Sequence, residues 1–129
     1  MPAPLLAPEL DRDRQPPLIA LLRFHALACR TSPRAGLTPE DAARAAAVED
    51  MALLLARMLP VLLLRRPVLW RPGTAGRSFD EDWLLALARA LRAGDADSAR
   101  FLLTRRARPE GAATLRMLVG DLAERLDTN

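Results

Sequence analysis

The most apolar stretch of the chain is MALLLARMLPVLLL, residues 51–64, in which Arg57 is the single charged side chain. A helix that is apolar on nearly all sides must be covered by other parts of the protein. The stretch has 14 residues, fewer than the roughly 20 that are needed to span a bilayer. We therefore expect residues 51–64 to form the buried central helix of a soluble bundle.

A first helix is predicted upstream of this segment, because Pro16 and Pro17 occupy positions that the first turn of a helix tolerates. It should end near Arg30, before a loop that contains serine, proline and glycine. Arg23 and Arg30 are seven positions apart, so we expect them to mark the solvent-facing side of this helix. The residues that follow one another at helical spacing are Leu18, Leu21, Leu22, His25 and Cys29.

The start of the helix that leads into the central segment has a clear local signal. Thr38 can serve as its N-cap, and Pro39 suits the first helical position. Asp41 follows the cap by three residues, as in a short version of the capping box. The alanine-rich run up to Val48 then allows a neighbouring helix to approach closely.

Two prolines limit the central helix. Pro60 lacks a backbone N–H and clashes with the preceding turn, so we expect a kink or a break there. Residues 61–66 would then either continue at an angle or form a separate turn, and Pro67 would end the element. Residues 67–77 contain two prolines and two glycines and are predicted to form the longest internal connection.

The third long helix is predicted to begin after Ser78, which forms a capping-box pattern with Glu81. Gly94 suits the position just beyond the C-terminus of this helix, where a left-handed backbone conformation is common. One face of the helix is predicted to consist of Trp83, Leu87, Ala90 and Leu91.

Two further helices follow after short connections. Asp95 can cap a helix from residue 96 to about residue 106, and Pro109 can begin the last helix. Short connections force consecutive helices to pack as antiparallel or sharply angled pairs. The last helix keeps its apolar residues at intervals of three and four, and these are Leu115, Leu118, Val119, Leu122 and Leu126.

The composition agrees with an all-α protein. Half of the 129 residues are hydrophobic, aromatic residues make up 4%, and tyrosine is absent, a bias that favours helices over strands. A chain of this length fits one domain. We predict a proline-rich, extended and flexible arm over residues 1–15, followed by a single compact bundle of about five helices over residues 16–129.

Charge and cysteine content restrict the class of protein further. All 19 basic residues are arginine, and the net charge of +3 is too even for polyanion binding without a local patch. The arginine, alanine and proline content is typical of a GC-rich bacterial genome. A single cysteine excludes an internal disulfide framework, and the N-terminus lacks the basic start and continuous apolar run of a signal peptide. These features predict a cytoplasmic protein.

His25 and Cys29 are candidates for metal binding or nucleophilic chemistry, because they lie four positions apart on one predicted helix. A structural zinc site takes four ligands, however, and the chain contains no other histidine or cysteine. A Cys–His nucleophile would also need an orienting partner, which the sequence does not show. We therefore expect both residues to pack against the core.

Two groups of acidic residues could in principle support acid–base chemistry or cation binding. Asp80, Glu81 and Asp82 lie at a predicted helix start, where the helix dipole favours carboxylates, and we interpret them in that way. Glu49 and Asp50 interrupt an otherwise apolar helix. For this pair we expect one residue to be solvated and the other to meet an arginine of a neighbouring helix.

The basic residues Arg105, Arg106 and Arg108, with Arg100 and Arg116 on either side, lie between two helices that a tight turn connects. This is the arrangement of a helix-turn-helix, whose second helix enters the major groove of DNA. Cations also suit the C-terminus of a helix, and the second helix opens with Pro-Glu-Gly-Ala-Ala instead of base-reading residues. A DNA-binding regulator is therefore the alternative function.

Arg65, Arg66, Trp70 and Arg71 follow the central segment in the way that interfacial anchors follow a membrane helix. The arginine and proline inside the segment argue against a membrane role. Exposed tryptophan together with arginine is also the composition that is enriched at the centres of protein interfaces. We therefore predict a partner-binding surface that includes these four residues and the rest of segment 61–71.

The leading hypothesis is a non-enzymatic helical interaction module, such as a regulator, an adaptor or an assembly protein. Catalytic side chains are scarce, with one histidine, one cysteine and no tyrosine. The six glycines form none of the usual phosphate-binding motifs, so no metal, nucleotide or covalent cofactor is expected. The generous apolar content predicts that the partner is another protein or a second copy in a homodimer. Nucleic acid is a less favoured partner, and a membrane surface is the least favoured.

Overall fold

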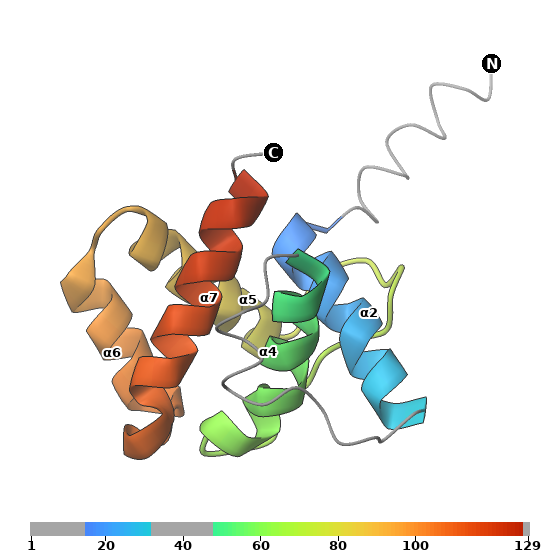
Figure 1. Cartoon of the computed structure of the whole chain (residues 1–129), viewed down its shortest axis with the longest axis horizontal. Coiled ribbons are helices and arrows are strands. Elements are labelled where there is room, and N and C mark those ends of the chain that lie inside the picture. Colours follow the sequence, from blue (N-terminus) through green and yellow to red (C-terminus); the bar gives the residue numbers. More distant parts are fainter. Residues whose placement is uncertain (1–14, 32–47, 128–129) are drawn as a thin grey trace.

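The computed structural model describes residues 15–31 and 48–127, and these residues form the predicted all-α bundle (Figure 1). Nearly all of the predicted N-terminal arm, and the helix start predicted at Thr38, Pro39 and Asp41, lie outside the described residues. The described elements are the α-helices α2 (Pro17–Thr31), α4 (Val48–Leu62), α5 (Phe79–Arg92), α6 (Ala96–Arg106) and α7 (Ala112–Asp127), and the short 3-10 helix η1 (Pro109–Gly111).

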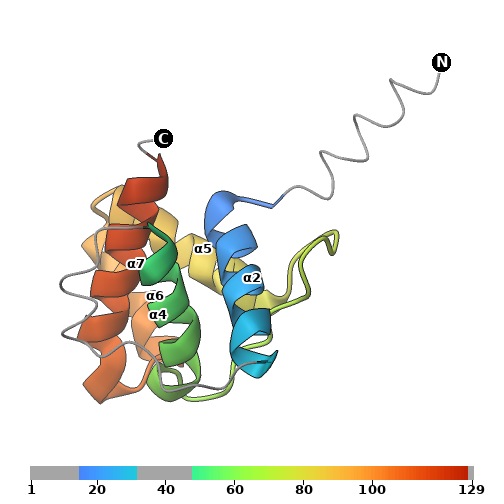
Figure 2. The ribbon, with the colours of Figure 1, turned by 45° about the vertical axis from the view of Figure 1, so that its right-hand side comes forward.

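Helix α4 is the central helix that the apolar pattern predicts. It packs against α2 on one side and α7 on the other, and both views of the ribbon show it between these two helices (Figures 1 and 2). Helix α5 packs against α6 and α7 and completes the bundle. The residues of α4 that are buried are Met51, Ala52, Leu54, Leu55, Ala56, Leu59 and Leu62.

Of the kink or break predicted at Pro60, the break is wrong, because α4 continues through this residue and ends at Leu62, well before Pro67. A proline near the end of a helix removes one backbone hydrogen bond, here to the carbonyl one turn earlier. The Pro60 side chain is exposed and lies close to the end of the helix. The loss of one hydrogen bond at this place is therefore compatible with a continuous helix.

Long-range pairing determines where α4 ends. The N–H of Leu64 donates to the carbonyl of Arg106 at 2.8 Å, and the N–H of Arg108 donates to the carbonyl of Leu62 at 2.8 Å. Leu63 and Ala107 thereby form an isolated antiparallel bridge between the ends of α4 and α6. The backbone groups that would continue α4 are used in this bridge instead.

The helix ends that local sequence signals predict are confirmed at α5 and α6. The Ser78 hydroxyl accepts a hydrogen bond from the N–H of Glu81 at 3.1 Å, and the Glu81 carboxylate accepts one from the N–H of Ser78 at 3.0 Å. Gly94 follows α5 with a φ of 71°, which an L-residue rarely adopts. Asp95 then caps α6 by accepting a hydrogen bond from the N–H of Ser98 at 3.1 Å.

Gly111 in η1 lies against the end of α4. A Cβ atom at this position would lie 2.8 Å from a terminal methyl group of Leu62 and 3.4 Å from its Cα and carbonyl oxygen. Such a distance is shorter than normal van der Waals contact, and Leu62 is buried. The glycine therefore allows the turn between α6 and α7 to approach the central helix.

We expect Gly111→Ala to lower the free energy of unfolding by about 1–2 kcal/mol, because overpacking displaces Leu62. Gly120→Ala is the matched control. Gly120 lies inside α7, and a Cβ atom there would lie 3.6 Å from Leu91 of α5, which is an ordinary van der Waals distance. The control should be neutral or stabilising by up to about 1 kcal/mol. Urea denaturation of both variants measures the difference, and equal stability of the two would contradict the close approach.

Among the described residues, no helix is long and apolar enough to cross a membrane.

Candidate functional site

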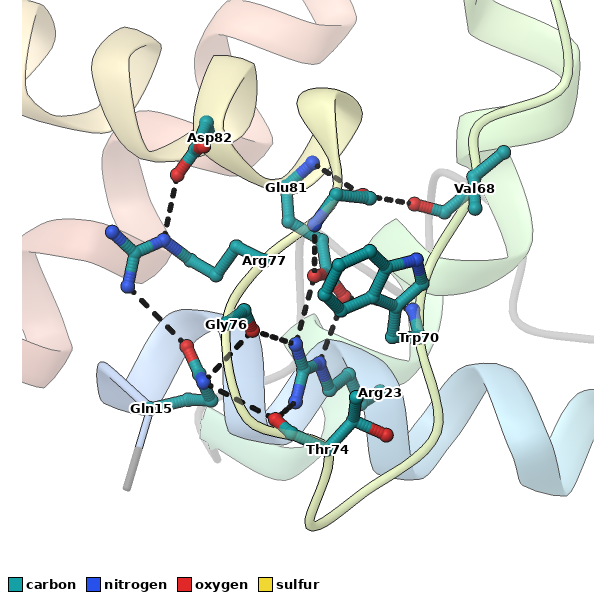
Figure 3. A network of polar contacts seen from close by, with 10 residues as sticks. Gln15, Arg23, Val68, Trp70, Thr74, Gly76, Arg77, Glu81 and Asp82 are labelled. Carbon is teal, nitrogen blue, oxygen red and sulfur yellow. Dashed lines mark hydrogen bonds and ion pairs between the residues drawn. The ribbon is translucent and has the colours of Figure 1, made fainter. Parts of the chain in front are cut away.

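Arg23 is buried in the structure, with 1% of its surface exposed, and the prediction that it faces solvent is wrong. Its Nε donates to Oε2 of Glu81 at 2.8 Å, and its Nη2 donates to Oε1 at 2.9 Å (Figure 3). Glu81 on α5 is itself fully buried, at 0% exposure. A two-pronged ion pair therefore joins α2 to α5 inside the protein. The side chain of Arg30, the other residue of the predicted stripe, lies outside the described side chains.

The same pair fixes the long connection between α4 and α5. Arg23 donates to the carbonyls of Thr74 and Gly76, each at 2.8 Å, and Glu81 accepts from the N–H of Trp70 at 2.9 Å. Figure 3 shows these groups converging on the Arg23 guanidinium and the Glu81 carboxylate. Because protein groups satisfy both charges, the network holds the connection in place and offers no open binding position.

The electrostatics of Glu81 reflect this arrangement. Burial by itself raises the pKa of the carboxyl group. Hydrogen bonds from Arg23 and from the N–H groups of Ser78 and Trp70, with the positive charge of Arg23, outweigh burial and hold the pKa below its ordinary value of 4.5. Glu81 is therefore a permanently charged structural group near neutral pH.

The three acids at the start of α5 have separate partners, which the helix-dipole interpretation did not foresee. Asp80 is buried, forms an ion pair with Arg106 of α6, and accepts a hydrogen bond from the N–H of Val68 at 2.7 Å. Asp82 accepts from Nε of Arg77 at 2.6 Å on the exposed side of the helix. These acids therefore have roles beyond the helix dipole, and Asp80 connects α5 to α6.

Two exposed phenylalanine rings lie against neighbouring arginines at the end of α6. The guanidinium carbon of Arg106 lies 5.1 Å from the centroid of the Phe79 ring, and that of Arg105 lies 5.6 Å from the centroid of Phe101. Both distances are typical of cation–π contacts. Phe79 is 73% exposed and Phe101 is 60% exposed. Two phenylalanine rings, each with an arginine over one face, are therefore presented to solvent.

A recess of about 260 Å³ lies between the end of α4 and the end of α6. It is lined by Leu64, Arg65, Arg105 and Arg106. Leu64 is also an exposed large apolar residue, as is Val68 on the connection that follows. We call this surface the aromatic–arginine face, and define it as Leu64, Arg65, Val68, Phe79, Phe101, Arg105 and Arg106.

The residues predicted for partner binding fall in two places. Arg65 belongs to the recess of the aromatic–arginine face, and the neighbouring Arg66 is exposed. Trp70 lies against Gly76 in the long connection, with its N–H bound to Glu81, and the adjacent Arg71 is exposed. Trp70 therefore packs on its own loop, while Arg65 lies next to α6.

The five arginines of the helix-turn-helix alternative do not share one environment. Arg105 stacks on Phe101, and Arg106 is bound to Asp80. Arg100 and Arg108 are exposed. Arg116 lines a hollow with Asp95, Ala96 and Ala99, which places it near the beginning of α6, away from the end that carries Arg105 and Arg106.

His25 is buried, as predicted, and its Nε2 lies 2.9 Å from Oε1 of Glu49. Glu49 therefore meets a histidine of α2, whereas an arginine was expected, and Asp50 is exposed. The side chain of Cys29 lies outside the described side chains. Within the described residues, no group of three or more potential metal ligands occurs.

A groove of about 510 Å³ lies where the start of α2 meets the C-terminal ends of α5 and α7. Its described lining is apolar apart from Arg89 and Arg92, and it includes Leu85 and Leu126. Among the described residues that line the groove, none carries a carboxylate, imidazole or thiol for proton transfer or covalent chemistry.

Comparison of the chain with protein-family models, with curated proteins and with solved structures finds no match. The function is therefore inferred from the surface chemistry of the described residues.

Leu64 and Val68 lie in segment 61–71, which the sequence assigned to the partner surface, whereas Phe79 and Phe101 were not assigned to it. A local signal was available for one of them, because Phe101 and Arg105 are four positions apart on a helix and can contact each other. Phe79 and Arg106 come together only through the packing of α5 against α6. Their contact could not be read from local spacing.

Proposed function

We propose that the chain is a non-enzymatic interaction module that binds a protein partner through its aromatic–arginine face. The observation that carries this proposal is the exposure of Phe79 and Phe101, each stacked against an arginine, beside a recess. Aromatic residues and arginine are enriched at the centres of protein interfaces. Apolar surface on such rings contributes about 25 cal/mol per Å² when a partner covers it.

The chemistry of the recess favours binding over catalysis. Its lining consists of one leucine and three arginines. The guanidinium group of arginine only donates hydrogen bonds and does not serve as a general base. It can hold an anionic group by charge and by two parallel hydrogen bonds. We infer that the face recognises and positions a partner without transforming it.

A photo-cross-linking amino acid placed at position 101 tests the proposal in cells of the source organism. We expect a discrete cross-linked product with a second protein, and we expect Phe79→Ala in the same chain to reduce its yield severalfold. Phe24 is the matched control position, because it is an exposed phenylalanine on α2, which lies across the bundle from α6 (Figure 1). Cross-linker at position 24 should not give the same product.

Two outcomes would count against the proposed function. Equal cross-linking from positions 24 and 101 would show that the product arises from random collision. Absence of any protein product from position 101, with the cross-linker shown to be reactive, would mean that the face binds no protein in the cell.

A further inference from the structure

We infer that the aromatic–arginine face is built for an acidic peptide segment that carries a large apolar anchor, an inference that rests on the proposed function. Within the part of the chain that the structure describes, neither Arg65 nor Arg105 has a carboxylate partner. Asp80, which adjoins the face, is already bound by Arg106. Among the described residues, the face therefore presents positive charge that no carboxylate pairs with, beside exposed apolar rings.

Two of the three arginines of the recess, Arg105 and Arg106, are also held in position before any partner arrives. Arg105 stacks on Phe101, and Arg106 is fixed by both Asp80 and Phe79. A guanidinium that is already oriented loses little conformational freedom when it binds a carboxylate. Acidic side chains placed next to an apolar anchor can thus reach Arg65 and Arg105 while the anchor contacts Leu64 and the phenylalanine rings.

The charge of the face argues against a second copy of this chain as its occupant. A two-fold dimer brings the same surface of both protomers together. Such a dimer would place Arg65 and Arg105 of one copy near the same residues of the other, and juxtaposed like charges are unfavourable. Acidic residues of a different partner would instead neutralise them.

The stacked arginines also make a lipid bilayer or a nucleic acid a poorer occupant. Insertion of Phe79 and Phe101 into hydrocarbon would either carry the stacked guanidinium groups with them or break both contacts, and a charge in hydrocarbon is costly. Bases stack on the faces of aromatic rings. One face of each phenylalanine is already covered, which leaves ring edges and aliphatic groups that suit an apolar side chain.

Fluorescence anisotropy with two synthetic peptides tests the inference. The first peptide combines glutamate with leucine and phenylalanine, and the second has glutamine in place of every glutamate. We expect the acidic peptide to bind the purified full chain at least about tenfold more tightly than the neutral one, and this preference should shrink as salt increases. A double variant, Arg65→Gln with Arg105→Gln, should lose the preference for the acidic peptide.

The controls separate charge, apolar contact and folding. Arg116→Gln removes an exposed arginine near the beginning of α6 and should leave both affinities unchanged. Phe101→Ala should weaken both peptides severalfold, because the apolar contact is common to them. A melting temperature close to that of the parent protein shows that each variant is folded.

Several results would overturn the inference. Equal affinity for the two peptides, or no binding of either at millimolar concentration, would remove the preference for an acidic segment. Displacement of the acidic peptide by phosphatidylserine-containing vesicles or by a single-stranded oligonucleotide, with direct binding of that competitor to the face, would assign the face to a lipid or a nucleic acid. A dimer in light scattering that Phe101→Ala dissociates would make a second copy the occupant.

Failure of this inference is distinguishable from failure of the proposed function. If position 101 still cross-links specifically to a protein while the purified chain shows no preference for acidic peptides, the interaction module stands and the acidic partner is wrong. If the specific cross-link is also absent, the proposed function itself is wrong.

Discussion

Glu81→Gln is expected to lower the free energy of unfolding by about 3–5 kcal/mol, because the substitution leaves the Arg23 guanidinium buried without a counter-charge. In the parent protein, Oε1 of Glu81 accepts from Arg23 and from the N–H of Ser78, and Oε2 accepts from Arg23 and from the N–H of Trp70. The single oxygen of a glutamine amide can replace one of these acceptors, and its NH₂ group accepts from none of the donors. At least one buried donor is then left without a partner. Urea denaturation followed by circular dichroism measures the loss.

Asp82→Asn is the matched control for this experiment. Asp82 is the next residue along α5, and it is paired with Arg77 on the exposed side of the helix. Exposed ion pairs contribute about 0–1 kcal/mol, so the control should lose no more than that. Equal losses for Glu81→Gln and Asp82→Asn would show that the buried ion pair has no special role in stability.

The depressed pKa of Glu81 also predicts how stability depends on pH. A carboxyl group whose pKa is lower in the folded state contributes stability that is fully present above its unfolded pKa. This contribution disappears as the pH falls below the ordinary value of 4.5 and through the folded pKa. The parent protein should therefore lose more unfolding free energy than Glu81→Gln between neutral pH and about pH 3. Parallel curves for the two proteins would contradict the assignment.

Local signals predicted the ends of helices well, because a cap depends on a few neighbouring residues. Ser78 with Glu81, Gly94 and Asp95 all have the expected roles in the structure. Each of these signals involves side-chain or backbone contacts within one or two turns. For the same reason, local signals gave no information about the second role of Glu81, which is to bind Arg23.

The burial of Arg23 could not be predicted from local signals. Its partner Glu81 lies 58 positions further along the chain. An arginine on an amphipathic helix is usually exposed, so helical spacing alone assigns it to the solvent side. The burial becomes favourable only because the carbonyls of Thr74 and Gly76 and the Glu81 carboxylate meet at one point in the folded chain.

The end of α4 and the aromatic–arginine face both depend on contacts between residues that are far apart in the sequence. The end of α4 depends on a bridge to α6, which forms between residues more than 40 positions apart in the sequence, Leu63 and Ala107. The contacts of Arg106 with Phe79 and Asp80 likewise depend on how α5 and α6 pack. Sequence reasoning identified Arg105 and Arg106 as a basic segment, but their partners, and hence the chemistry of the surface, came from tertiary structure.

Leu54→Ala should lower the free energy of unfolding by about 2–5 kcal/mol, since a large core side chain leaves a cavity that its surroundings fill only in part. Leu54 is 2% exposed and lies in the middle of α4. Helix α4 packs against α2 and α7, and the bridge at Leu63 fixes its C-terminal end. Collapse of the cavity would require these elements to move together, which favours a loss in the upper part of the range.

Val61→Ala provides the comparison within the same helix, because Val61 is 63% exposed and its truncation creates no cavity. It should change the unfolding free energy by no more than about 0.5 kcal/mol, as ordinary surface substitutions do. Denaturant unfolding of the two variants under identical conditions gives the difference directly. A loss below about 0.5 kcal/mol for Leu54→Ala would mean that the middle of α4 is not the centre of the core, and the bundle would then have to be organised around another helix.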